Sequence, residues 1–171
     1  MGTTAHGFNE AGLLDSLNTT HSELVIAVRL VLAAGLGAVV GWERERRDRA
    51  AGLRTHMLTA LAAATFTILT FEIYARVTYA NGGTNADPIR VIEAVTAGVA
   101  FLAAGAIFRS QGDVHGLTTG AGMWLAGATG VASGAGYYVL AIMTTLLAAF
   151  ILAVIRHIEV RLGEKTPLGD D

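Results

Sequence analysis

The chain has 171 residues, of which 53% are hydrophobic and 15% are charged, and its formal net charge is −2. A soluble domain is normally about 25% charged, so too little charge is present to cover a water-exposed surface, as the mean hydropathy of +0.51 also indicates. Cysteine is absent, which excludes disulfides and thiolate metal sites. The composition therefore indicates an integral membrane protein.

Five segments are apolar and long enough to cross a bilayer, which takes about 20 mostly apolar residues. In chain order they are residues 24–42, 55–77, 91–108, 117–133 and 137–155. We predict an all-α membrane protein, a bundle of five transmembrane helices that forms one domain over residues 24–160. Residues 1–23 have neither the basic start nor the apolar core of a cleaved signal peptide. We expect them to form an acidic tail, and residues 161–171 to form a second tail.

The distribution of basic residues predicts how this bundle is oriented. With five spans, nine of the 12 lysines and arginines fall on one side of the membrane: Arg44, Arg46, Arg47, Arg49, Arg54, Arg109, Arg156, Arg161 and Lys165. Arg76 and Arg90 fall on the other side, and Arg29 lies within the first helix. Because Lys and Arg are enriched in cytoplasmic loops, we expect the N-terminus outside and the C-terminus in the cytoplasm. A four-span alternative without residues 117–133 would separate Arg109 from the basic tail and fits worse.

Several helices carry pairs of small residues spaced four apart. The pairs are Gly37 and Gly41, Ala100 and Ala104, Gly116 and Gly120, and Gly130 and Gly134. Such pairs let the backbone of another helix approach closely. We expect ordinary packing within the bundle, with a dimer interface or a flexible gate as the alternative.

Arg29, Glu72 and Glu93 are charged residues that the predicted helices place at membrane depth. All three reach the outer leaflet, where a pair between Arg29 and either carboxylate would satisfy both charges. Asp87 and Arg90 lie just outside and extend the cluster. One hypothesis is an outward-facing site for a cation or a proton; the other is that Arg29 reaches the interface while the carboxylates meet water. The sequence does not name a metal, and the arginines oppose the binding of a divalent cation.

The turn at residues 43–54 interleaves carboxylates with arginines, a pattern that membrane orientation alone does not require. If the first helix continues through the turn, Glu43 can pair with Arg47, and Glu45 with Arg49, because each pair is four residues apart. Arg54 or Arg109 could also reach Glu43. We therefore predict that this turn is a functional site as well as a topology signal.

Three motifs resemble those of the MgtC/SapB family of bacterial inner-membrane proteins. The first, G-x-E-R followed by a basic stretch and A-G-L-R-T, is matched by Gly41, Glu43, Arg44, Ala51, Gly52, Leu53, Arg54 and Thr55. The second, D-P-x-R before a glycine-rich helix, is matched by Asp87, Pro88, Arg90, Gly98, Phe101, Leu102, Ala104, Gly105 and Ile107, with Arg109 close behind. The third, R-G-L-x-T-A-A-x-x-W, is partly matched by Gly116, Leu117, Thr119, Ala121 and Trp124.

The resemblance covers about residues 24–160 and implies a set of candidate functional residues. They are Glu43, Arg44, Gly52, Arg54, Thr55, Asp87, Arg90 and Arg109. The chain departs from the family at Ala94, Ala100, Ala103, Glu93 and His115. It also ends before the ACT-like C-terminal domain that some members carry, so it resembles a short-form member.

The resemblance implies a non-enzymatic membrane protein without a cofactor. Members are linked to growth at low Mg²⁺ and to virulence, and some bind other membrane proteins, including the F-type ATP synthase. The alternative hypothesis is a small transporter or channel for Mg²⁺ or another cation, assembled as a homo-oligomer.

Other kinds of function find little support in the sequence. The chain has neither a His-Glu-x-x-His run nor a Gly-x-Ser-x-Gly elbow, and nothing suggests nucleic-acid binding. Its histidines are His6, His21, His56, His115 and His157. His56 and His115 could pair around a metal, but we expect both to be solvated at the membrane interface.

Overall fold

The computed structural model describes residues 19–47, 49, 51–81, 87–110 and 113–161. In these ranges the chain forms the helices α2 (Glu23–Glu45), α3 (Leu53–Asn81), α4 (Ile89–Gly105), α5 (Leu117–Gly134) and α6 (Tyr138–Arg161). One helix lies on each of the five predicted segments, so the prediction of a helical membrane bundle is confirmed. Apart from residues 19–23 and Arg161, the two predicted tails lie outside the described residues.

A short β-hairpin follows α4, where the sequence predicts the last turn of a helix ending at residue 108. Strands β1 (Phe108–Ser110) and β2 (Asp113–His115) pair antiparallel, with Phe108 opposite His115. The two rings stack with their centroids 5.5 Å apart. The helix ends early because the N–H groups of Ala106 and Ile107 bond three residues back, to Ala103 and Ala104, and tighten the last turn.

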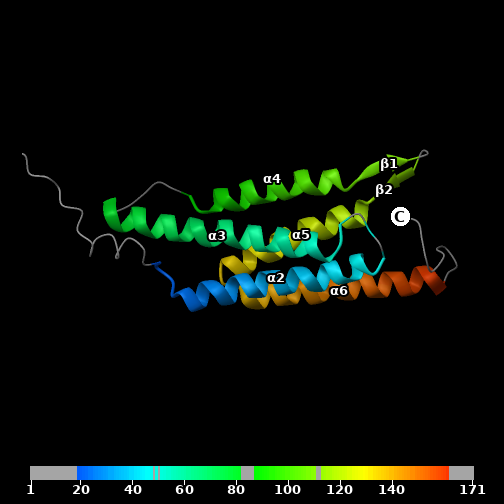
Figure 1. Cartoon of the computed structure of the whole chain (residues 1–171), viewed down its shortest axis with the longest axis horizontal. Helices are drawn as coiled ribbons and strands as arrows, with labels where there is room; N and C mark the ends of the chain where they lie inside the picture. Colours follow the sequence, from blue (N-terminus) through cyan, green and yellow to red (C-terminus); the bar gives the residue numbers. More distant parts are fainter. Residues whose placement is uncertain (1–18, 48, 50, 82–86, 111–112, 162–171) are drawn as a thin grey trace, which may run out of the picture.

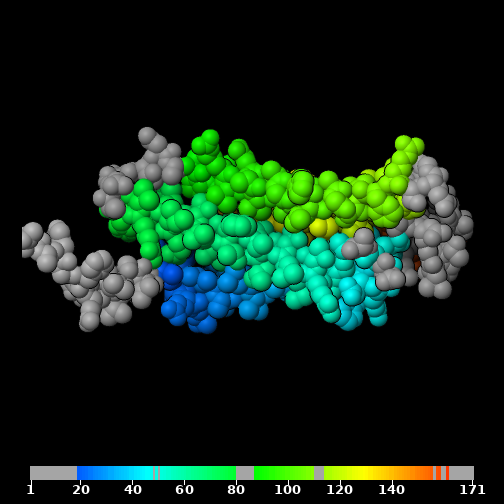
Figure 2. All heavy atoms as spheres, turned by 45° about the horizontal axis from the view of Figure 1, so that its top comes forward, coloured from blue at the N-terminus to red at the C-terminus, as the bar shows by residue number. Residues whose placement is uncertain are grey.

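Successive helices run antiparallel along the long axis of the molecule (Figure 1). We call one end of the bundle the turn end: it holds the end of α2, the start of α3, the hairpin and the end of α6. Helix α5 lies in the centre and contacts all four other helices. Figure 2 shows α3 and α4 side by side, with only a small area of α5 visible between the surrounding helices.

Small side chains face the interior of the bundle and large apolar ones face outward. Ala60, Ala64 and Ala126 are fully buried, whereas Phe101 is 80% exposed and Phe150 is 63% exposed. Water-soluble proteins bury their large apolar side chains, while membrane helices pack through small residues and present large ones to lipid. The burial pattern therefore agrees with the composition in indicating a membrane protein.

Helix α5 packs closely on α3 through glycine. A β-carbon placed on Gly130 would overlap the carbonyl oxygen of Ala60, and one on Gly134 would lie 2.6 Å from that of Ala64. These contacts confirm that the Gly130 and Gly134 pair serves packing within the bundle. The same prediction is wrong for Ala100 and Ala104, which are exposed because they lie on the side of α4 that points away from α5.

Three described helices contain segments long and apolar enough to cross a membrane by length and composition: Glu23–Glu45, Leu53–Tyr79 and Tyr138–Ile155. Helix α4 has 17 residues, close to the lower limit of about 17 for a span. Helix α5 is rich in glycine, and its inward residues meet protein rather than lipid. Hydropathy alone therefore does not decide whether these two helices are complete spans.

Candidate functional site

The turn end holds the candidate site predicted at residues 43–54. Glu43 lies in the last turn of α2 and pairs with two arginines. Its Oε2 accepts a hydrogen bond from Arg44 Nε at 3.1 Å, and its Oε1 forms an ion pair with Arg47, four residues later. The predicted Glu43–Arg47 pair is thus confirmed, while neither Arg54 nor Arg109 has a recorded contact with Glu43.

Glu45 does not form the predicted pair with Arg49, because α2 ends at Glu45 instead of continuing through the turn. Its Oε2 accepts a hydrogen bond from the backbone N–H of Leu53 at 2.9 Å. Leu53 is the first residue of α3, where N–H groups have no partner within the helix. Glu45 therefore fixes where α3 begins, and a β-carbon on Gly52 would displace the Glu45 carboxylate from this position.

The remaining motif residues of the turn differ in burial. Arg44 is only 5% exposed, although it carries a full charge. Arg54 is exposed on the first turn of α3, and Thr55 is partly buried. The Thr55 carbonyl accepts the hydroxyl of Thr59 at 2.8 Å. Of the two motif arginines, Arg54 is therefore the one available to another molecule.

His56 is completely buried, so the prediction of a solvated interfacial histidine is wrong. Its Nδ1 lies 2.8 Å from the carbonyl oxygen of Gly52, which can only accept, so Nδ1 donates. Three glycines enclose the residue: β-carbons on Gly37, Gly41 and Gly122 would each lie 3.0 Å or less from an atom of His56. The sequence does hold one indication that His56 has a structural role, because it directly follows the A-G-L-R-T run.

Arg29, at the opposite end of the bundle, does not pair with Glu72 or Glu93. Its Nη1 donates to the carbonyl oxygen of Gly134 at 2.9 Å, and its Nε donates to the Tyr138 hydroxyl at 3.3 Å. Gly134 is the last residue of α5, where carbonyl groups lack a helical partner and the helix dipole is negative. Arg29 thus stabilises the end of α5 and the turn into α6.

Glu72 holds the segment that precedes α2. Its carboxylate accepts hydrogen bonds from the backbone N–H groups of Thr20, at 2.6 Å, and His21, at 3.1 Å. The same carboxylate lies 2.7 Å from Nδ1 of the His21 ring. Glu72 is therefore occupied by the N-terminal segment, a partner that the charge pattern of the sequence does not predict.

The other predicted outer residues do not join a cluster. Glu93 and Arg90 are exposed on α4, and the Asp87 carboxylate accepts a hydrogen bond from the N–H of Ile89 at the start of that helix. Arg109 is exposed on the hairpin at the turn end. Within the described ranges, no group of three histidine, aspartate or glutamate side chains could hold a metal ion.

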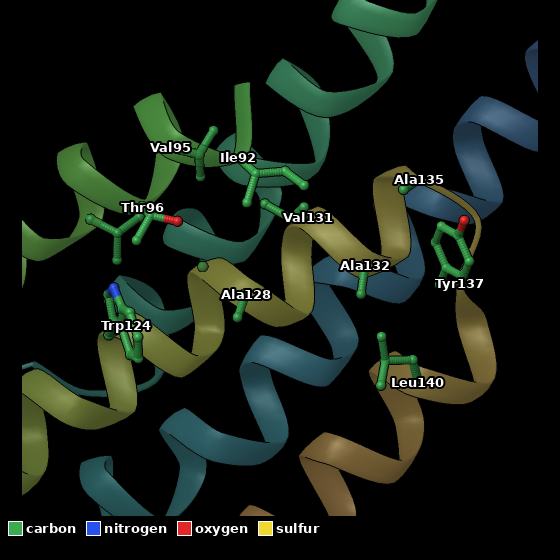
Figure 3. Close-up of a pocket in the computed structure, with 12 residues that line it drawn as sticks. Ile92, Val95, Thr96, Trp124, Ala128, Val131, Ala132, Ala135, Tyr137 and Leu140 are labelled. Atoms are coloured by element: carbon green, nitrogen blue, oxygen red, sulfur yellow. The ribbon is translucent and has the colours of Figure 1, made fainter. Parts of the chain in front are cut away.

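An apolar groove of about 430 Å³ runs along the surface where α4, α5 and α6 meet (Figure 3). Its floor is formed by small residues of α5, including Gly127, Ala128 and Ala132. Trp124 and Tyr137 also line it. The groove is suited to an apolar occupant, such as an acyl chain or the side chains of another helix.

The inward-facing small residues, the outward-facing large ones and the three long apolar helices together define a multi-pass membrane protein. The sequence profile of the MgtC family matches residues 30–161. The chain belongs to the MgtC family and is a multi-pass protein of the bacterial inner membrane. No solved structure is significantly similar to it.

Several relatives are similar over most of this chain. It is 36% identical to YhiD of Escherichia coli over 138 residues, which are 81% of this chain and 64% of YhiD. It is 39% identical to MgtC of Brucella abortus over 119 residues, 70% of this chain and 45% of that protein. For SapB of Bacillus subtilis the values are 36% identity over 120 residues, 66% of this chain and 49% of SapB. The match thus spans about half to two thirds of each relative's length.

Proposed function

We propose that this protein is a non-enzymatic member of the MgtC family that acts through other inner-membrane proteins in adaptation to low Mg²⁺ or in virulence. The contact site in this proposal is the turn at residues 43–54, with the exposed Arg54 as its central residue. The F-type ATP synthase is a candidate partner, as the family resemblance implies, and the chain itself is a candidate homo-oligomer.

One observation carries this proposal: specific side-chain contacts hold the described residues of the turn. Glu43 pairs with Arg44 and Arg47, and Glu45 fixes the start of α3. Arg54 is left exposed on a rigid helix, one residue after the N–H that Glu45 caps. A positively charged side chain held in this way is suited to recognising an acidic surface on a partner.

We also infer five spans, with the N-terminus outside and the turn end in the cytoplasm. The support is the antiparallel course of the helices, which brings Arg44, Arg54, Arg109 and Arg161 to the turn end and leaves Arg76 and Arg90 at the other. Basic residues favour the cytoplasmic side. Cysteine labelling from outside at introduced cysteines in residues 43–54 and 82–86 tests this orientation: only the second set should react.

Charge reversal at Arg54 tests the contact site. We expect Arg54→Glu to remove growth at low Mg²⁺ in a strain that depends on this protein, while its amount in the membrane stays at the wild-type level. Arg161→Glu is the matched control, because it makes the same charge change at an exposed residue of the turn end and should support normal growth. Full activity of Arg54→Glu would refute the contact site, and equal loss in both variants would mean that only the total charge matters.

The second candidate function is transport of Mg²⁺ or another cation, favoured by the description of the YhiD relative as a candidate magnesium transporter. It needs the outer charges to face a pathway, whereas Arg29 and Glu72 are each engaged by other parts of the chain. We therefore expect proteoliposomes that contain the protein to move Mg²⁺ no faster than empty liposomes. Protein-dependent flux that Glu72→Gln abolishes would establish the transporter instead.

A further inference from the structure

Among the described residues of the turn, Arg44, Arg47 and Arg49 gather beside the two carboxylates Glu43 and Glu45. Arg47 and Arg49 lie close enough to Arg44 for their charges to repel it, and Arg44 is almost entirely buried. The Glu43 carboxylate is shared between Arg44 and Arg47. The Glu45 carboxylate is occupied by the backbone N–H of Leu53.

Besides Arg47 Nε, which is ion-paired with Glu43, two guanidinium nitrogens among the described residues of this cluster are buried and have neither a hydrogen-bond nor an ion-pair partner. They are Nη2 of Arg47 and Nε of Arg49. Buried polar groups in native proteins are nearly always satisfied, and an unsatisfied one commonly indicates a missing water or ion. Because both nitrogens are charged donors, the group that satisfies them must be an acceptor, and an anion is strongly favoured.

The position of the turn explains why these donors are withdrawn from water. Ala51, in the same turn, is buried against Met123 of α5 and Ala103 of α4. The turn therefore packs against the bundle at Ala51. At the same end of the bundle, α5 begins at Leu117 and its N-cap residue, Gly116, offers no side-chain cap, so the first N–H groups of α5 add a positive partial charge to this end.

We propose that Arg44, Arg47 and Arg49 form a binding site for a phosphoryl group. Guanidinium groups match the geometry of phosphate oxygens and bind them through paired, charge-assisted hydrogen bonds. The phosphoryl group belongs either to the headgroup of an anionic phospholipid or to a soluble phosphate compound, since both offer the same oxygens. Basic pockets at the cytoplasmic ends of membrane helices bind such headgroups. Phosphoryl binding does not depend on the partner contact proposed for Arg54.

Binding is measured on the purified full-length protein. One arm follows thermal unfolding in a neutral detergent during titration with inorganic phosphate. The other arm uses native mass spectrometry to compare retention of phosphatidylglycerol with that of phosphatidylcholine. Retention of phosphatidylglycerol alone would identify a lipid headgroup as the source, and stabilisation by inorganic phosphate would show that a soluble phosphate also binds.

The double variant Arg47→Gln/Arg49→Gln should weaken binding of the active probe roughly tenfold or more, the loss of about one charge-assisted hydrogen bond. Arg161→Gln is the control and should change binding less than about twofold, since an exposed charge at the same end contributes little. The single variant Arg49→Gln serves if the double variant does not elute as a folded protein. Absence of binding by both probes, or equal loss in the control, would overturn the proposal. Growth at low Mg²⁺ is not read in this experiment, so its failure would leave the role of Arg54 untouched.

Discussion

Replacing Gly130 with alanine is expected to lower the free energy of unfolding by about 1–3 kcal/mol, the usual cost of overpacking a well-packed interior. The added methyl group would overlap the carbonyl oxygen of Ala60, so α5 would have to move away from α3. Backbone atoms cannot rotate aside as a flexible side chain can. The change should appear as a lower midpoint of thermal unfolding for the purified protein in detergent.

Gly35→Ala is the matched control. A β-carbon on Gly35 meets nothing within 4 Å, and this residue also lies inside a long helix. Alanine favours the helical conformation over glycine by about 1 kcal/mol, so Gly35→Ala should leave the midpoint unchanged or raise it. Equal destabilisation by both substitutions would mean that the α3–α5 contact is not as close as described.

Substitutions at His56 are expected to lower the free energy of unfolding, because this residue, like Gly130, lies at a tightly packed position. His56→Leu removes the hydrogen bond from Nδ1 to the Gly52 carbonyl, which keeps the backbone N–H of residue 56 as a donor, and should cost about 1 kcal/mol of stability. His56→Asn should cost less, because an asparagine side-chain amide can donate from nearly the position of Nδ1. The order of unfolding midpoints should therefore be wild type, then His56→Asn, then His56→Leu.

Gly122 provides an independent check on the same site. A β-carbon on Gly122 would lie 3.0 Å from His56 Nε2, so Gly122→Ala should destabilise the wild-type protein. Asparagine has no atom at the position of Nε2, so Gly122→Ala should be less harmful in the His56→Asn background. A double-mutant cycle measures this coupling; strictly additive effects would show that the two residues do not press on each other.

The helices could be predicted because a membrane span needs a minimum length of apolar residues. Such stretches are visible directly in the sequence. All five predicted segments contain a helix, although every helix extends at least one residue beyond its segment at one end or both. The hairpin after α4 could not be predicted in this way. It depends on the pairing of Phe108 with His115, which neither residue's own type nor its neighbours in the sequence predict.

Some contacts of the turn could be predicted because they join residues that are close in the sequence. Glu43 and Arg47 are four apart on one helix, so their pairing is a local property that helical geometry dictates. The same reasoning gave the wrong partner for Glu45. The helix ends at this residue, so its carboxylate accepts from the N–H of Leu53, eight residues away, instead of pairing with Arg49. Where a helix ends determines which partner is in reach, and the local charge pattern did not reveal that end.

The sequence by itself determined that this chain is a helical membrane protein of the MgtC family. The lengths of its apolar segments and the spacing of its motifs are both properties of the sequence alone. It also led to the prediction, which stays a prediction, that residues 43–54 form a functional site as well as a topology signal. Only the tertiary structure decided which charges meet. Arg29 stabilises the end of α5, more than 100 positions away, and Glu72 holds the segment before α2. Membrane depth limits where a charge can lie, but helix packing decides which partner lies beside it there.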